Sequence, residues 1–376
     1  MDFCTTKKAL RDHLAGLTKE LISFPSHVNE PQKVIELADF IKNYFAKDNL
    51  FINEYIFDGL PALVIATEDT KHPHLMLSGH MDVVPSSYVY SAKQEGDLLY
   101  GSGAMDMKSG IACIMAVMKC FAQEKNRPSL AAMITGDEEI GGEAAQMLLN
   151  EEGYSTDFCI VNEGRQRYEI VNREKGLLAL QITLKANPVH SAYPWKGKNV
   201  TEDLMKLCMN VKKHFPKVKD GWTPNVSVTY FNVGLGDEIN TIPGEATATL
   251  FFRLTDKRRW TREKILALIK GLAPSAEVRE MVYGDVFDMD PKNFYINMLR
   301  GVASDVAKKR IGFGSNHGGS DARFFAEKNI PTAILGPVGK DHHSPNECVS
   351  VESMVTHFKV LQKFIADDWK EYTKRV

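Results

Sequence analysis

The sequence predicts an α/β protein into which a smaller α+β unit is inserted. Short apolar runs of strand length alternate with helical apolar spacing along the first part of the chain, which indicates a sheet flanked by helices. Between residues 175 and 283 the pattern changes to alternating strands and two helices, which favours helices on an antiparallel sheet. The chain then returns to the first pattern and ends in an amphipathic helix.

The composition is that of a globular protein long enough for two domains. The 376 residues are 44% hydrophobic and 25% charged, and a net charge of −2 gives no indication of a nucleic-acid or membrane partner. No apolar run has the length of a membrane span, and the first residues lack the apolar core of a secretory signal. The six cysteines are scattered, which predicts reduced thiols and a cytoplasmic location, and argues against a thiolate zinc cluster.

The elements of the larger part follow from apolar periodicity and from turn and capping residues. Ser350 is expected to be the N-cap of a final helix that runs toward Tyr372. The expected helices are 10–21, 34–45, 111–121 and 294–308, and the expected strands are 57–66 after a turn, 75–77, 130–135, a run from 158 that ends near Glu163, and 332–335.

The inserted unit is expected to be two helices on a four-stranded antiparallel sheet. Its strands are predicted at 177–184, 226–233, 246–254 and 277–282, and its helices at 200–213 and 262–272.

The stretch 75–85 carries the first candidate site. A buried strand ends at Ser78-Gly79, and His80 and Asp82 follow two residues apart. If the strand alternation persists, both side chains lie on one face at the carboxyl end of a strand, where α/β sheets bind ligands. This pair fits a metal-bound histidine oriented by a carboxylate, but equally a hydrogen bond that closes a loop.

A glycine-rich loop at 101–110 carries Asp106 into the next helix. The loop resembles a dinucleotide fingerprint only weakly, because the third glycine is missing and Asp106 would repel a pyrophosphate. A dinucleotide-dependent enzyme is therefore the most distant alternative. Taken alone, Asp106 is better explained as a helix cap than as a metal ligand.

Three consecutive carboxylates, at 137–139, follow the strand 130–135. Such a cluster is either solvated or holds cations, and its apolar strand and double glycine favour cations. Glu138 and Glu139 point in different directions from an extended backbone, so one can bind metal while the other faces the substrate as a base. Glu163 ends another strand, which makes a shared metal site at the strand ends more convincing.

Taken in order, these motifs resemble the di-zinc hydrolase family (metallopeptidase family 20) that includes succinyl-diaminopimelate desuccinylase, acetylornithine deacetylase, aminoacylase and glutamate carboxypeptidase. The resemblance spans nearly the whole chain. Its motifs are Gly79-His80-Met-Asp82-Val-Val-Pro85, Gly103-Ala-Met-Asp106-Met-Lys108, Asp137-Glu138-Glu139-Ile-Gly141-Gly142, Glu163, His190-Ser-Ala-Tyr-Pro194, Asn240-Thr-Ile-Pro243, Ser320-Asp-Ala-Arg323 and His343-Ser-Pro-Asn-Glu347.

The resemblance implies a zinc-peptidase-like catalytic domain and a lid domain. The catalytic domain, with a central mixed sheet flanked by helices, would comprise residues 1–174 and 284–376. The lid, residues 175–283, would also form a homodimer. Each subunit would hold two zinc ions, which cobalt can replace. His80 and Glu163 would bind one ion, Glu139 and His343 would bind the other, and Asp106 would bridge both.

The catalytic roles also follow from the resemblance. Asp82 would orient the ring of His80, and Glu138 would be the general base that activates a water bridging the two metals. His343 is preferred to His342 because the family pattern His-x-x-x-Glu is completed by Glu347. The family also has a cis peptide after its bridging aspartate, so Asp106-Met107 is expected to be cis.

The lid would supply further residues to the active site. His190 would reach the active site of the neighbouring subunit and bind the oxyanion, with Asn240 nearby. Arg253 would bind the substrate's free carboxylate, although a salt bridge within the lid explains it equally well. Tyr193, Gly318 and Gly319 would line the pocket.

The expected function is hydrolysis of the amide bond of an N-acylated amino acid or small peptide with a free carboxylate. A carboxypeptidase or dipeptidase with the same site is the nearest alternative, and a catalytically silent metal-binding dimerisation protein is the alternative of another class. The desuccinylases carry a threonine where Gly319 stands and an asparagine near Gly339, and the loss of both argues against diaminopimelate as the substrate. Relatives also often have Gly-Glu-Pro where this chain has Asn162-Glu163-Gly164.

Overall fold

The chain folds into two compact units. The computed structural model describes residues 2–85, 89–234 and 239–373. Unit 1 comprises Met1–Asn172, Asp288–Ser315 and Ser320–Val376, and unit 2 comprises Arg173–Phe287 and Asn316–Gly319.

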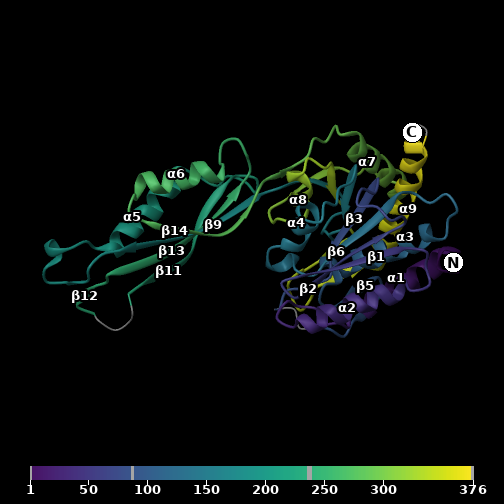
Figure 1. Ribbon diagram of the computed structural model, residues 1–376, viewed down its shortest axis with the longest axis horizontal. Coiled ribbons are helices and arrows are strands. Elements are labelled where there is room, and N and C mark those ends of the chain that lie inside the picture. The colour runs from purple at the N-terminus through teal and green to yellow at the C-terminus, as the bar shows by residue number, and fades with distance from the viewer. Residues whose placement is uncertain (1, 86–88, 235–238, 374–376) are drawn as a thin grey trace. The chain divides into compact units, whose positions relative to one another are not determined.

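Unit 1 is built on the mixed sheet that the sequence predicts (Figure 1). Its strand order is β1-β2-β6-β3-β7-β17-β8-β15, and β16 pairs with β8. Strands β6, β3, β7 and β17 run parallel to one another, whereas β1 pairs antiparallel with β2, β2 with β6 and β8 with β17. The strands are β1 Phe51–Phe57, β2 Leu60–Ala66, β3 Leu75–His80, β6 Leu130–Thr135, β7 Phe158–Val161, β8 Ile170–Glu174, β15 Phe287–Asp288, β16 Phe313–Asn316 and β17 Thr332–Ile334.

The central strands are buried because helices flank the sheet. Every residue of β3 and β6 is buried, as expected where parallel strands are covered on both faces, and so is every residue of the neighbouring β2. Helix α3 is apolar on nearly all sides and packs against α1, α9 and β3. The helices are α1 Lys7–Ile22, α2 Pro31–Tyr44, α3 Ser109–Ala122, α4 Glu143–Asn150, α7 Phe294–Ala307, α8 Ala322–Glu327 and α9 Val351–Thr373. The predicted cap is confirmed, since Ser350 Oγ accepts from Ser353 N at 3.1 Å.

A second, small sheet in unit 1 is not expected from the sequence. Its strands, in the order β18-β19-β5-β4, are too short to show an apolar period. Cys348 pairs with Tyr100 across β19 and β5, which places the loop before Cys348 beside the loop after Tyr100. Those two loops carry His343 and Asp106. The strands are β18 Gly339–Lys340, β19 Cys348–Ser350, β5 Leu98–Tyr100 and β4 Lys93–Glu95.

Strand β1 is also not expected from the sequence, which indicates only a turn followed by a strand at 57–66. In the structure a tight turn joins β1 to β2. Asp58 (φ 47°) and Gly59 (φ 82°) both take the left-handed conformation that a two-residue hairpin needs. Strand β1 lies at the sheet edge with partly exposed side chains, so it lacks the apolar run that marks the central strands.

Unit 2 has the predicted α+β architecture. Its antiparallel sheet has the order β11-β13-β9-β14, and helix α5 packs against β13, β11 and β9 as well as against α6. Leu204, Leu250 and Phe252 are fully buried in its core. The elements are β9 Gly176–Lys185, β10 Val189–His190, α5 Val200–Lys213, β11 Asn225–Val233, β12 Thr241–Ile242, β13 Glu245–Leu254, α6 Arg262–Leu272 and β14 Glu277–Gly284.

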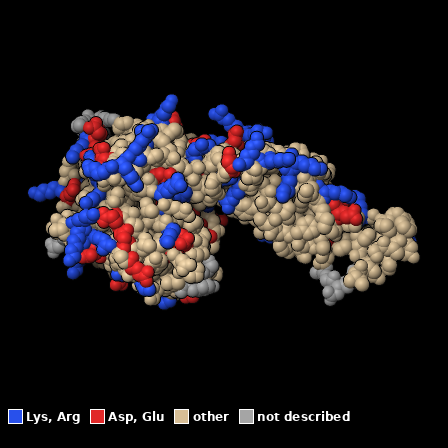
Figure 2. Space-filling view, turned by 180° about the vertical axis from the view of Figure 1, so that it is seen from behind, with Lys and Arg blue, Asp and Glu red and all other residues tan. Residues whose placement is uncertain are grey.

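Charges of both signs are distributed over the molecule. Figure 2 shows Lys and Arg side chains interspersed with Asp and Glu side chains over unit 1 on the face that it displays. Within the described residues, none of the helices combines the length and the apolar character that crossing a membrane requires.

A buried histidine links the last helix of unit 1 to the sheet. His74 Nδ1 lies 2.7 Å from Asp157 Oδ2, and its Nε2 lies 2.8 Å from Asp368 Oδ2 on α9. Burial acts to lower the pKa of His74, but the hydrogen bonds with Asp368 and Asp157 outweigh burial and raise this pKa above 6.5. The folded state therefore binds the proton more tightly than the unfolded state, and the stabilisation is complete only below pH 6.5.

We expect His74→Gln to destabilise the fold by about 1.5–3 kcal/mol below pH 6.5, the usual range for hydrogen bonds to charged groups. The difference from the wild type should shrink as the pH rises through the raised pKa of His74, because the wild type loses the proton there. Denaturant unfolding of both proteins across this pH range measures the effect. His72→Gln, at an exposed histidine, is the control, and an equal loss for His74→Gln at every pH would contradict the charged interaction.

Candidate active site and metal centre

Three parallel strands bring the predicted site residues to one edge of the sheet. Strand β3 lies between β6 and β7, so the carboxyl ends of the three strands are neighbours. His80 is the last residue of β3, the carboxylates 137–139 follow β6, and Glu163 follows β7. Parallel α/β sheets bind ligands outside these strand ends.

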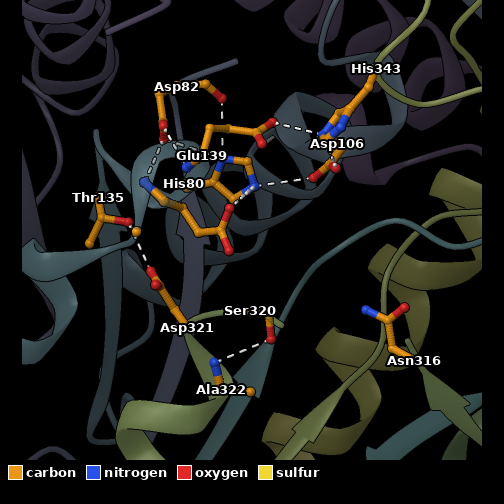
Figure 3. Close-up of polar contacts among 12 residues, drawn as sticks. His80, Asp82, Asp106, Thr135, Glu139, Asn316, Ser320, Asp321, Ala322 and His343 are labelled. Atoms are coloured by element: carbon orange, nitrogen blue, oxygen red, sulfur yellow. Dashed lines mark hydrogen bonds and ion pairs between the residues drawn. The ribbon is translucent and has the colours of Figure 1, made fainter. Parts of the chain in front are cut away.

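Asp106 lies between two histidine rings. Its Oδ1 is 3.1 Å from His80 Nε2, and its Oδ2 is 3.3 Å from His343 Nε2 (Figure 3). Each carboxylate oxygen therefore faces a different ring, as a ligand shared by two metal ions would. The Asp106-Met107 peptide bond is cis, which confirms the expectation from the resemblance.

His343 and Glu139 form the second half of the arrangement. Glu139 Oε1 lies 3.2 Å from His343 Nε2, and one ligand atom from each of Asp106, Glu139 and His343 lies within 4.8 Å of the others. The hydrogen bonds with Asp106 and Glu139 raise the pKa of His343 to about 10. His342, the rival candidate, and His343 are both exposed, but it is His343 that lies against the carboxylates of Asp106 and Glu139.

Asp82 contacts both His80 and the backbone of Glu138 and Glu139. Its Oδ1 lies 3.3 Å from His80 Nδ1, and the carboxylate also accepts hydrogen bonds from Glu138 N at 3.2 Å and Glu139 N at 2.9 Å. Asp82 thus fixes both the ring of His80 and the backbone that carries the two glutamates. Strand β3 ends at His80, so this contact arises from the irregular backbone that follows and not from strand alternation.

The backbone at Glu138 and Glu139 is not extended, which corrects the sequence-based assumption. Residues Glu138–Ile140 form one turn of 3₁₀ helix that ends at Gly141, whose φ of 136° favours glycine. The two side chains nevertheless diverge. Glu139 faces His343, whereas Glu138 Oε2 lies 4.0 Å from His80 Nε2.

A small cavity lies beside His80. It measures about 10 Å³, room for roughly one water-sized particle. Its lining includes His80, Glu138 and Glu163. Burial raises the pKa of Glu138 well above its usual range, and the neighbouring carboxylates of Asp321 and Glu163 act in the same direction. A carboxylate with a raised pKa beside a water-sized space is suited to accept a proton.

The donor set fits divalent metal ions. Imidazole nitrogens and carboxylate oxygens are ligands that zinc accepts, and here they converge from separate elements onto Asp106. Glu139 Oε1 is buried and lies 3.2 Å from His343 Nε2. A cation between the carboxylates and the rings would compensate this buried negative charge.

Glu347 is a buried residue to which the sequence analysis assigns no role. Its carboxylate accepts hydrogen bonds from Gly103 N at 2.9 Å, Met105 N at 2.8 Å and Asp106 N at 2.9 Å. Burial raises the pKa of Glu347 to about 7. Glu347 therefore holds the backbone of the loop that presents Asp106, and its spacing from His343 is the one sequence signal that points to it.

Asp321 is a second buried carboxylate that the sequence analysis leaves without a role. It accepts a hydrogen bond from Thr135 Oγ1 at 3.1 Å and lines the same cavity as Glu138 (Figure 3). Burial raises the pKa of Asp321 to about 6. The Ser320–Arg323 motif contains Asp321, but its spacing alone does not reveal that the side chain reaches the end of β6.

Three of the predicted lid residues lie together in unit 2. His190 and Asn240 belong to two segments joined by the pairing of β10 with β12, and Ser191 N donates to Asn240 O at 2.8 Å. The ring of Tyr193 lies 5.8 Å from that of His190. His190 and Tyr193 are exposed.

The other three predicted substrate-binding residues are also in unit 2. Arg253 lies on β13, and Gly318 and Gly319 lie in the segment Asn316–Gly319. Arg253 Nη1 is buried and makes no hydrogen bond with any residue that the structure describes. Burial lowers the pKa of nearby Lys175, and the charge of Arg253 lowers it further.

Comparison with known proteins gives a match over most of the chain. The family model described as Peptidase family M20/M25/M40 matches residues 76–367. A protein of Gluconacetobacter diazotrophicus named succinyl-diaminopimelate desuccinylase is 30% identical, with 78% of this chain and 80% of that protein covered. A protein of the same name from Pelagibacter ubique is 29% identical, with 95% and 94% covered.

Solved structures share the fold at low sequence identity. Aminopeptidase PepT from Bacillus cereus superposes with a TM-score of 0.78 at 18% identity, covering 94% of this chain and 98% of that chain. An M20 family metallo-carboxypeptidase from Sulfolobus solfataricus gives 0.76 at 18% identity, covering 94% and 98%. A dinuclear metal-binding peptidase of the same family from Bacillus subtilis gives 0.71 at 14% identity, covering 96% and 99%.

Proposed function

This chain belongs to peptidase family M20/M25/M40, whose members are metal-dependent hydrolases of amide bonds, and we propose that it deacylates an N-acylated amino acid with a free carboxylate. The observation that carries this proposal is the placement of Asp106 between His80 and His343, with Glu138 beside the same cluster. The names of the two curated relatives favour a deacylase over a peptidase.

The ligand set that we propose holds two zinc ions. His80 and Glu163 would bind one ion, Glu139 and His343 the other, and Asp106 both. Two divalent ions held in this way would lower the pKa of a water between them and polarise the carbonyl of the substrate.

The residues of the chain would then move the protons. Glu138 is not in the proposed ligand set, so its carboxylate is available to take the proton of the attacking water and to pass it to the leaving amine. Asp82 accepts hydrogen bonds from the backbone N–H groups of Glu138 and Glu139, and this fixes the position of the base relative to the metal ligand. In unit 2, His190 and Asn240 would donate to the oxyanion that forms.

Arg253 and Lys175 are suited to anchor the carboxylate of the substrate. The guanidinium of Arg253 has a buried Nη1 donor without a hydrogen-bond partner among the described residues, and the buried Lys175 adds a second positive charge nearby. An arginine can bind a carboxylate through two parallel hydrogen bonds. The free carboxylate is therefore the part of the substrate that we expect to be required.

Hydrolysis of a substrate panel with added Zn²⁺ or Co²⁺ and with chelator controls tests the proposal. The panel contains N-acetyl-ornithine, N-acetyl-citrulline, N-succinyl-diaminopimelate, N-acetyl-methionine, their carboxamide analogues and several dipeptides. We expect chelator-sensitive turnover of an acylated amino acid and little turnover of its carboxamide. Turnover of dipeptides alone would overturn the deacylase assignment in favour of a peptidase.

Unit 2 also supports a proposed homodimer. Both β11 and β14 are edge strands of its sheet. Both strands have a register shift, but β14 carries charged residues, which protect an edge from pairing, whereas β11 has none. Four apolar side chains of β11 are exposed, and α5 beside it exposes two methionines. These are Val228, Tyr230, Phe231, Val233, Met205 and Met209.

We expect Tyr230→Glu to weaken the dimer by at least about tenfold, because a charge would replace an aromatic side chain on the uncharged edge. Met281→Glu on β14 is the matched control, since Met281 and Tyr230 are both 49% exposed. Sedimentation velocity over a range of concentrations measures both variants. A dimer that Met281→Glu dissociates and Tyr230→Glu leaves intact would place the interface elsewhere.

A further inference from the structure

A buried polar network joins the two strand ends that carry His80 and Glu163. Asn162, which directly precedes Glu163, is fully buried. Its backbone N–H donates to Ser78 O at 2.9 Å, and its side-chain Nδ2 donates to Ile160 O at 2.8 Å and to Ser78 O at 3.3 Å. Ser78 lies two residues before His80, so Asn162 ties the end of β7 to the end of β3.

Helix α9 supplies the residue that fixes the Asn162 side chain. His357, also fully buried, places Nε2 2.9 Å from Asn162 Oδ1 and Nδ1 3.2 Å from the Tyr168 hydroxyl. Because an amide oxygen only accepts, Nε2 must carry the proton and Nδ1 must accept from Tyr168. Burial lowers the pKa of His357 to about 3, so the ring stays neutral and keeps this tautomer near neutral pH.

Every polar side-chain atom at the centre of the network makes a hydrogen bond. Both protons of the Asn162 amide and its oxygen are used, and both nitrogens of His357 are used. Buried networks of this kind hold a single arrangement because any displacement leaves a polar group unpaired.

Close packing restricts the same backbone from two other sides. A Cβ added at Gly110 would lie 2.1 Å from Asn162 O, and one added at Gly336 would lie 2.2 Å from Glu163 O. The carbonyl groups of residues 162 and 163 therefore touch other backbone directly. The side chain of Asn162 is held by hydrogen bonds, and His357 is its partner from α9.

We propose that His357 and Asn162 are positioning residues that set the spacing of His80 and Glu163, so that these two donors share one divalent ion. This inference rests on the proposed function, because it requires His80 and Glu163 to bind the same ion. His357 lies on α9 and acts through Asn162. Its loss should therefore weaken the binding of only one ion, the one that His80 and Glu163 would share. The other ion would be held by Glu139 and His343, which come from other elements, together with the shared Asp106.

The test compares three variants of the metal-free chain. His357→Leu removes the donor to Asn162 Oδ1, whereas His357→Gln can return an N–H to that position. Leu361→Ala, at a fully buried residue one turn further along α9, removes packing and leaves the network intact. Competition with a chromophoric chelator gives the two Zn²⁺ dissociation constants of each protein, and thermal unfolding without metal gives its stability.

We expect His357→Leu to weaken one Zn²⁺-binding step by about 10- to 100-fold, the usual cost of losing a residue that orients metal ligands. His357→Gln should recover most of this affinity. Leu361→Ala should lower the unfolding temperature while both Zn²⁺ affinities stay close to those of the wild type.

Two results would overturn the inference. Unchanged Zn²⁺ affinities in His357→Leu would show that the network does not position the ligands. Equal weakening of both steps in His357→Leu and Leu361→Ala would show that the loss follows general destabilisation. A wild-type chain that binds no divalent ion would instead overturn the proposed function itself, so the two failures can be told apart.

Discussion

Glu138→Gln is expected to bind metal as the wild type does and to hydrolyse its acylated substrate about 10²- to 10⁴-fold more slowly, the usual contribution of a general base. The amide has nearly the same shape as the carboxylate but cannot accept a proton from water. Glu138 Oε2 lies 4.0 Å from His80 Nε2, close to the ligand cluster but outside the proposed ligand set. The substitution should therefore lower kcat and leave the metal content unchanged.

Steady-state kinetics and metal analysis of the same preparation check this result. Glu143→Gln is a suitable control, because Glu143 is an exposed glutamate at the start of α4 and should tolerate the change. Loss of a metal ion from Glu138→Gln would instead make Glu138 a ligand. Turnover near the wild-type rate would remove it from the mechanism.

Asp106→Asn is the second change with a large expected effect. The two oxygens of Asp106 face His80 and His343 separately, at 3.1 and 3.3 Å. Asparagine offers only one oxygen and no charge, so it can serve one ion at most. Since losing a residue that merely orients ligands costs about 10- to 100-fold in metal affinity, this variant should bind its weaker ion at least about 100-fold less tightly.

Isothermal titration of metal-free Asp106→Asn with Zn²⁺ measures this effect. Asp97→Asn, at an exposed aspartate of unit 1, is the control for the loss of a carboxylate. Turnover should fall together with the occupancy of the weaker site. Two ions bound at wild-type affinity would contradict a bridging role for Asp106.

The strand-end part of the site could be predicted from the sequence because its signals are local. An apolar run followed by His80 and Asp82, or by the carboxylates 137–139, marks both a buried strand and the polar residues at its end. The carboxyl ends of strands meet when the strands are parallel and adjacent, and this holds for β6, β3 and β7.

The supporting residues could not be predicted in this way. Glu347 contacts the backbone of Asp106 across 241 residues of sequence, and His357 contacts Asn162 across 195. Both contacts depend on how α9 and the small sheet pack, and the strands of that sheet are too short to give a periodic signal. A single histidine within an amphipathic helix also carries no sequence signal of the residue that it contacts.

The backbone at Glu138 illustrates a further limit. The sequence shows three adjacent carboxylates, and an extended backbone would separate the directions of Glu138 and Glu139 by alternation. The structure separates them within a 3₁₀ turn whose N–H groups are bound by Asp82. Here the outcome was predicted and its cause was not, because the cause is a contact between two loops.

Titration of the metal-free protein with Zn²⁺, with hydrolysis of the best acylated amino acid followed at each addition, tests the central claim most directly. The account predicts no turnover without metal, and turnover that rises until two equivalents are bound per chain. Turnover that persists in the metal-free protein, or that is indifferent to added Zn²⁺, would contradict a metal-dependent hydrolase centred on Asp106.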